Sequence, residues 1–123
     1  MERELIESRE LLQLITDSMP ATVAYVNADE RYEFVNESCA RQFQTDKQSL
    51  LGRQVCDVLG EVNYQQVESR LKAALAGEPQ HYELQMQVPG SDEVQFKDVA
   101  YAPHRLADGS IAGCSVLVVD ITE

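Results

Sequence analysis

The chain has 123 residues, a size that suits one domain with a single hydrophobic core. Hydrophobic residues make up 44% and charged residues 25%, which excludes a disordered chain, and no apolar run approaches the ~18 residues of a membrane-spanning helix. The net charge of -11 excludes nucleic acid and anionic membrane surfaces as expected partners, because their phosphates would repel the domain, and leaves proteins or small molecules.

The first predicted element is an amphipathic helix over residues 1–19, which Pro20 stops because proline has no amide proton. Leu5, Leu12 and Met19 fall at one heptad position and Ile15 at the other, a short coiled-coil seam. Two interpretations follow: the helix packs on its own domain, or it pairs with the same helix in a homodimer. Both can hold, with the later turns capping the domain and the earlier ones pairing.

A hairpin and a cluster of short helices come next. Two β-prone runs at residues 22–26 and 32–35 flank a polar turn and predict the hairpin. Asn36 can cap a helix over residues 37–43. A capping-box pattern over residues 45–48, with Thr45 as the cap, then predicts another short helix.

The second half of the chain predicts one long helix followed by three strands. A further capping pattern at residues 63–66 opens the helix, and Gly77 ends it. Alternation of apolar and polar residues predicts a strand over residues 81–88, and turn sequences lead into strands over residues 94–105 and 111–122. The order of elements favours an α+β fold: a five-stranded antiparallel sheet with short helices on one face.

Several local motifs accompany this order: Met19-Pro20, Tyr32 to Asn36, Leu51-Gly52-Arg53, Ala76-Gly77-Glu78-Pro79, Pro103 with Asp108-Gly109, Gly113, and Asp120 to Glu123. Together they resemble the PAS sensor domain of bacterial histidine kinases and diguanylate cyclases, over residues 11–123. The resemblance implies a PAS-like fold and a non-catalytic sensor and dimerisation module of a signalling protein, such as a two-component system. Residues 1–19 would be the dimerisation helix and residues 20–123 the PAS sensor domain.

The end of the chain resembles the PAS segment that links the last strand to an output domain. By this resemblance, Asp120 would hold the strand end through a hydrogen bond or ion pair, and Thr122 would cap or anchor the exit. A physical argument agrees for the aspartate, because an acid within an apolar strand costs stability unless it is paired. The resemblance therefore implies a covalently linked output domain, a kinase or a cyclase, in the parent protein.

PAS domains hold ligands between the sheet and the helices, and the resemblance places a pocket there. The matching positions are Phe43, Val55, Leu59, Val67, Leu71, Met86, Phe96, Tyr101, Cys114 and Val116. Each is also an ordinary core residue. Which residues of the strand around Phe96 face the pocket is ambiguous, because Val99 and Tyr101 continue its apolar alternation with a shift of one residue. We expect a small apolar or aromatic ligand. The alternative is a protein-interaction relay whose core is full.

Neither haem nor flavin is expected, and the identity of any cofactor stays open. Cys39 in the run NESCARQF lies earlier than the flavin-linked cysteine of light-sensing relatives. Haem-binding relatives carry a histidine on the long helix, where this chain has none, and His81 and His104 are expected at the surface. The scattered histidines and three cysteines suit neither a metal site nor disulfides.

Catalysis and location complete the expectations. No nucleophile motif or phosphate-binding glycine loop is present, so we expect no enzymatic activity. The catalytic alternative is a small α+β cone enzyme in which Tyr25 or Tyr101 and Asp98 transfer protons, which would require an acid inside the pocket. The reduced cysteines and the lack of signal-peptide order at the N-terminus indicate a cytoplasmic protein with no direct membrane contact.

Overall fold

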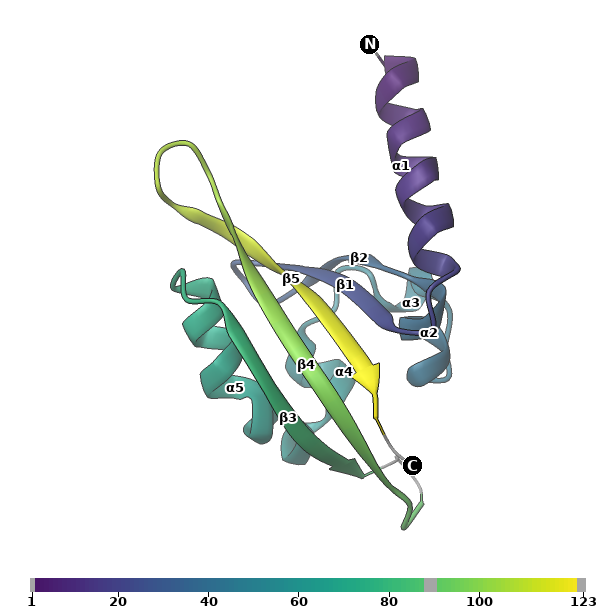
Figure 1. Cartoon of the computed structure of the whole chain (residues 1–123), viewed down its shortest axis with the longest axis vertical. Coiled ribbons are helices and arrows are strands. Elements are labelled where there is room, and N and C mark those ends of the chain that lie inside the picture. The colour runs from purple at the N-terminus through teal and green to yellow at the C-terminus, as the bar shows by residue number, and fades with distance from the viewer. Residues whose placement is uncertain (1, 88–90, 122–123) are drawn as a thin grey trace.

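The computed structural model describes residues 2–87 and 91–121, with the side chains of residues 8–86 and 91–121. Figure 1 shows a single twisted sheet with helices packed against it and the first helix, α1, projecting away from it. The α+β fold predicted from the order of elements is therefore confirmed.

Five antiparallel strands form the sheet in the order β2-β1-β5-β4-β3. Their bounds are β1 Thr22–Asn27, β2 Tyr32–Val35, β3 Gln80–Gln87, β4 Val94–Arg105 and β5 Ile111–Asp120. The last strand, β5, is central and pairs with β1 on one side and with β4 on the other. The predicted turn between β3 and β4 lies partly outside the described residues.

The helices are α1 Glu2–Asp17, α2 Glu37–Gln42, α3 Lys47–Leu50, α4 Val55–Leu59 and α5 Glu61–Leu75. Helices α2 to α5 form the second layer, whereas α1 contacts the rest of the chain at its C-terminal end (Figure 1). In the part of the chain that the structure describes, no helix combines the length and apolar character needed to cross a membrane.

The helix starts show which of the predicted caps form. Asn36 caps α2 as predicted, and its side chain accepts a hydrogen bond from the Cys39 amide. For α3 the cap is Asp46 and not Thr45, because the Asp46 carboxylate accepts from the Ser49 amide at 2.8 Å. Helix α5 begins directly after Gly60 and therefore before the predicted cap at residues 63–66. Gly60 has a φ of 82°, a left-handed conformation that lets the chain reverse between α4 and α5.

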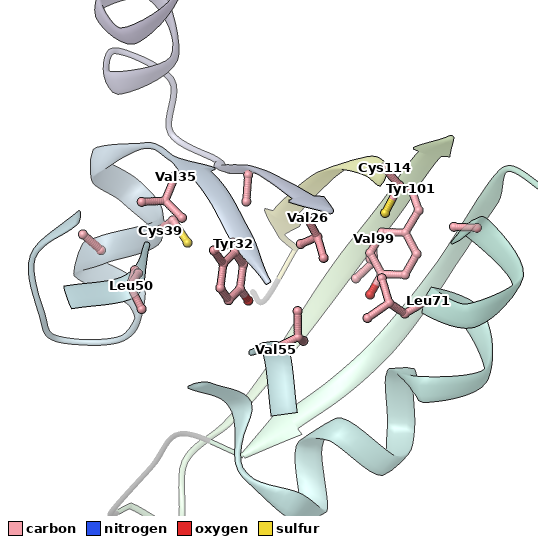
Figure 2. Packing of buried hydrophobic residues seen from close by; sticks show 13 residues of the cluster. Val26, Tyr32, Val35, Cys39, Leu50, Val55, Leu71, Val99, Tyr101 and Cys114 are labelled. Atoms are coloured by element: carbon pink, nitrogen blue, oxygen red, sulfur yellow. The ribbon is translucent and has the colours of Figure 1, made fainter. Parts of the chain in front are cut away.

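The hydrophobic core lies between the helical layer and one face of the sheet (Figure 2). Alternate residues of each strand point to this face, because successive side chains in a strand point in opposite directions. The most deeply buried members from the strands are Ala24, Val26, Val35, Val99 and Cys114. The helices contribute Cys39 and Ala40 from α2, Leu50 from α3, Val55 from α4 and Leu71 from α5.

Candidate functional site

A cavity of about 60 Å³ lies between the sheet and helices α2, α4 and α5. Its lining is mainly apolar and draws on every strand of the sheet. Eight residues named for the ligand pocket from the sequence surround it: Phe43, Val55, Leu59, Val67, Leu71, Met86, Tyr101 and Val116. The fold thus brings side chains that are far apart in the chain together around one cavity.

Two residues named for the pocket lie outside the cavity lining. Phe96 is 47% exposed, because the residues of β4 that face the helices are Lys97, Val99 and Tyr101. Phe96 is therefore on the opposite face of the sheet, which corrects the sequence-based placement. Cys114 is fully buried on the core face but does not border the cavity.

The phenol groups of Tyr82 and Tyr101 meet at the β3–β4 side of the site. Their hydroxyl oxygens are 2.8 Å apart, and the two rings pack edge to face. The Arg70 guanidinium lies 5.0 Å from the centre of the Tyr82 ring, a cation–π contact from α5. Burial raises the pKa of Tyr101 well above its usual range, so its hydroxyl stays protonated and satisfied by Tyr82.

Lys97 is a buried cation in this mainly apolar lining, and the sequence analysis did not identify it. The residue is 5% exposed, and its Nζ lies 3.4 Å from Gln42 Oε1 and 3.4 Å from Asp120 Oδ2. Asp120, the predicted junction residue, is the last residue of β5. The ion pair therefore connects the cavity lining to the end of the central strand. Thr122 lies outside the described residues.

Cys39 also lines the cavity, from α2. Burial raises the pKa of its thiol to about 12, so it is protonated and a weak nucleophile at neutral pH. A low pKa and an exposed position are what make a cysteine reactive, and Cys39 has neither.

Both histidines lie on the far face of the sheet, each in a hydrogen-bonded pair. His81 Nε2 is 2.8 Å from Asp98 Oδ1, and Tyr25 hydroxyl is 2.7 Å from His104 Nδ1. All four side chains are separated by the sheet from Tyr101, which points toward the helices. Among the described residues no Asp or Glu lines the cavity, and no group of three or more His, Cys, Asp or Glu side chains could hold a metal ion.

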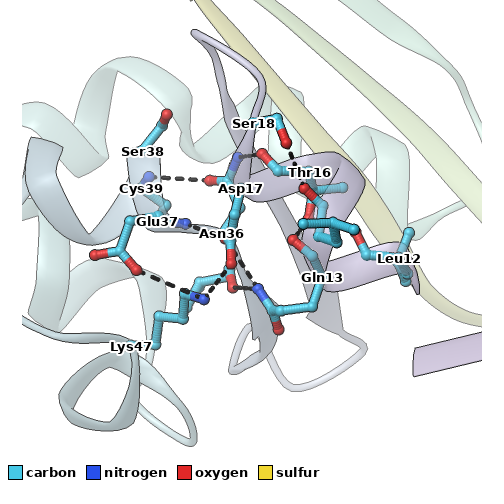
Figure 3. Close-up of polar contacts among 12 residues, drawn as sticks. Leu12, Gln13, Thr16, Asp17, Ser18, Asn36, Glu37, Ser38, Cys39 and Lys47 are labelled. Atoms are coloured by element: carbon cyan, nitrogen blue, oxygen red, sulfur yellow. Dashed lines mark hydrogen bonds and ion pairs between the residues drawn. The ribbon is translucent and has the colours of Figure 1, made fainter. Parts of the chain in front are cut away.

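A second polar centre joins α1 to the domain at Asn36 (Figure 3). The Asn36 amide is fully buried and makes four hydrogen bonds. Its Nδ2 donates to the carbonyls of Thr16 and Ala21, and its Oδ1 accepts from the amides of Val23 and Cys39. One side chain thus ties together the ends of α1, β1 and α2.

Asp17 adds a charged contact to the same junction. Its carboxylate accepts from Lys47 Nζ at 2.6 Å, from the Glu37 amide at 2.7 Å and from Gln13 Nε2 at 3.0 Å. Partial burial would raise the pKa of Asp17, but these hydrogen bonds outweigh it and hold the pKa below the ordinary value. The end of α1 is therefore held to α2 and α3 by polar contacts.

The opposite side of α1 is apolar and exposed. Leu11, Leu12, Leu14 and Ile15 are each at least 50% exposed, whereas Thr16 on the other side is buried. Of the residues predicted for dimerisation, Leu12 and Ile15 lie on this exposed surface, and Met19 is partly buried beyond the helix end. Leu5 belongs to α1, but its side chain is outside the described part of the structure.

Comparison with protein families matches residues 16–123 to the family described as the PAS fold. A comparison with curated proteins finds no match. Among solved structures, the PAS domain of BvgS from Bordetella pertussis is similar to this chain, with a TM-score of 0.75 and 19% sequence identity. The matched region covers 95% of this chain and 88% of the BvgS chain. The resemblance stated from the sequence motifs is therefore confirmed.

Two further structures are similar to this chain. A sensory box sensor histidine kinase from Vibrio cholerae matches 99% of this chain and 98% of its own, with a TM-score of 0.71 and 18% identity. The VqmA–ligand–DNA complex from Vibrio cholera matches 89% of this chain and 51% of its own, with a TM-score of 0.75 and 12% identity. At these identities the likeness establishes a shared fold.

Proposed function

The chain belongs to the PAS fold family, and from this premise we propose that it is a non-catalytic sensor and dimerisation module of a cytoplasmic signalling protein. The PAS fold is typical of signal-sensing modules in sensor kinases. In this proposal, a small molecule in the cavity changes the packing of the sheet. The change then passes along β5 to a C-terminal output domain, either a kinase or a cyclase.

The observation that carries this proposal is the position of Lys97. Its side chain belongs to the cavity lining and also pairs with Asp120 at the end of β5. A ligand shifts a protein between two states only if it binds them with different affinity. A contact that is shared between the cavity and the strand end offers such a difference. The similar VqmA structure contains a ligand, which supports the sensor class for this fold.

The exposed apolar side of α1 supports the dimerisation part of the proposal. Four large aliphatic side chains face solvent while the polar side of the helix holds the domain. In a helix that only caps its own domain, the apolar side would face inward. Pairing with α1 of a second copy would remove these side chains from water.

The size of the cavity favours a second candidate function, a protein-interaction relay without a ligand. Pockets for drug-sized ligands measure about 300–1,000 Å³, whereas this cavity measures about 60 Å³. Without movement of the surrounding side chains, it admits a few water molecules or a very small ligand. In such a relay, pairing of α1 with a partner would change the packing of a filled core, and the core would transmit the change to the output domain.

A native mass spectrum of the gently purified full chain, recorded beside a denatured control, tests these functions. A dimer that carries a small-molecule mass, lost on denaturation, is the expected result for a sensor. A dimer at the bare polypeptide mass would favour the relay. A monomer at micromolar concentrations would contradict the dimerisation part of the proposal in both forms.

A further inference from the structure

Two side chains of the cavity lining, Lys97 and Tyr32, offer hydrogen-bond donors. Lys97 carries three N–H donors, and its two contacts, both 3.4 Å long, exceed the roughly 2.7–2.9 Å of a strong charge-assisted hydrogen bond. The charge of the buried ammonium group is thus compensated by only two long hydrogen bonds among the described residues. Lys97 lines the same cavity as the side chain of Gln42, whose Oε1 is one of the two acceptors.

Tyr32 supplies a second donor from β2. The residue is 6% exposed and lines the cavity, and none of the described residues forms a hydrogen bond with its hydroxyl. Figure 2 shows the Tyr32 ring extending from β2 into the layer between the sheet and the helices, toward Val55. Burial raises the pKa of Tyr32 above its usual range, so the hydroxyl keeps its proton and can donate it to an acceptor.

The lining contains no group that would oppose an anion, since the described residues place no Asp or Glu there. The remaining wall is aliphatic and aromatic, with Val26, Leu71 and Val99 among its members. A ligand that fits this wall has a compact apolar body. A ligand that satisfies the donors carries acceptor oxygens, and a negative charge would compensate the buried ammonium.

We propose that the cavity binds a small carboxylate with an apolar body, whose oxygens accept a hydrogen bond from Lys97 Nζ. This inference rests on the proposed sensor function and specifies its ligand class. It also assigns the signal: the ligand carboxylate competes with Asp120 for Lys97. Binding therefore weakens the ion pair at the end of β5, and removing the Asp120 charge strengthens binding.

Binding can be measured by titrating the full ¹⁵N-labelled chain at constant ionic strength and recording amide shifts. The probes are sodium butyrate and sodium benzoate, with 1-butanol and benzyl alcohol as neutral controls of similar shape. We expect the carboxylates to shift amides around the cavity, including those of Val99 and Tyr101, at concentrations at least about tenfold below those of the alcohols.

Three variants and a control test the assignment of residues. Lys97→Met should weaken carboxylate binding at least about tenfold. Tyr32→Phe removes the second donor of the lining and should weaken binding less than Lys97→Met does. Asp120→Asn should tighten it, because the competing carboxylate becomes neutral. Lys72→Met, which removes an exposed lysine of α5, should leave it unchanged. The dispersion of the amide spectrum reports whether each variant is folded.

The outcomes separate this inference from the proposed function. Equal binding of alcohols and carboxylates would overturn the ligand class and leave a sensor of neutral molecules. No shift with either carboxylate would also overturn the class, while the native mass spectrum still decides whether the chain carries another ligand. If Lys97→Met fails to fold, the Asp120→Asn titration decides, because unchanged or weaker binding in that variant contradicts the competition.

Discussion

At the scale of single residues, the Asn36 side chain stands out because it forms four hydrogen bonds to the backbone. The nitrogen of its side-chain amide donates to two backbone carbonyls, and the oxygen accepts from two backbone amides. These four partners lie in α1, β1 and α2 and in the segment between α1 and β1. Three of these partners, on Thr16, Ala21 and Val23, are 13 to 20 residues away in the sequence, so they are not part of the local helix cap. The sequence predicted Asn36 as the cap of α2, which is correct, but the contacts to Thr16 and Ala21 depend on how distant segments pack.

Asn36→Asp tests this role with almost no change in shape. The variant keeps both acceptor contacts, loses both donors and places a carboxylate beside two carbonyl oxygens. We expect the free energy of unfolding at pH 7 to fall by about 3 kcal/mol, measured by urea denaturation. Gln66→Glu makes the same change from amide to carboxylate at an exposed position of α5 and is the control, which should change it by less than about 0.5 kcal/mol. Equal shifts in the two variants would contradict the role of Asn36.

Asp17 contributes a pH dependence whose sign follows from its lowered pKa. A carboxyl whose pKa is lower in the folded than in the unfolded state stabilises the fold above its unfolded pKa, and this stabilisation is lost as the pH falls through the folded pKa. Asp17→Asn should therefore be less stable than the wild type at pH 7. The difference in stability should shrink as the pH falls below 3.8, the ordinary pKa of an aspartate. Urea midpoints from neutral to acidic pH measure this difference.

The control for that experiment is Asp29→Asn, which neutralises an exposed carboxylate in the turn between β1 and β2. Its difference from the wild type should stay nearly constant over the same pH range. If the Asp17→Asn difference also stayed constant, the contacts of Asp17 with Lys47 and the Glu37 amide would contribute nothing to stability.

At the scale of elements, local patterns predicted much of the fold but not the orientation of every element. Alternation placed Tyr82, Leu84 and Met86 on one face of β3, and the structure has them partly buried there. In β4 the same approach failed, because a polar residue, Lys97, occupies an inward position next to the outward Phe96. Composition cannot show that a lysine points inward, since its burial depends on Asp120 and Gln42 from other elements.

Helix α1 shows the same limit. Its heptad pattern identified apolar side chains, but not whether they face the domain. That choice depends on Asn36 and Lys47, which hold the polar side of α1 from about 20 to 30 residues away in the sequence. The result is a helix whose apolar side, widened by Leu11 and Leu14, faces outward.

Leu12→Glu should therefore disrupt dimerisation, because it places a charge among aliphatic side chains. We expect the dissociation constant of the dimer to rise at least tenfold, or roughly 1.4 kcal/mol or more, as measured by sedimentation equilibrium. Arg9→Gln changes the net charge by the same amount on the exposed part of α1 and is the control. A Leu12→Glu dimer as tight as the wild type would restrict α1 to contacts within one chain.

At the scale of the whole molecule, charge opposes the association that α1 favours. Each chain carries a formal charge of -11, so two copies repel one another at long range. Salt screens this repulsion over a distance of about 10 Å at 0.1 M and less at higher concentration. The apolar contact itself does not depend on screening. Association should thus depend on ionic strength.

We expect the dissociation constant of the dimer to fall several-fold as sodium chloride rises from about 0.02 M to about 0.5 M. Sedimentation equilibrium at a series of salt concentrations measures the change. Weaker association at high salt would mean that ion pairs, rather than the aliphatic side chains of α1, hold the two copies together.

The position of β5 has a mechanical consequence. It is the central strand, so a pull along it loads the hydrogen bonds to β1 and β4 together, in shear. At the other end of the molecule, α1 is held mainly by a few side-chain contacts around Asn36 and Asp17 (Figures 1 and 3). Tension across the module would therefore peel α1 away first while the sheet stays intact. The module has one compliant end and one stiff end.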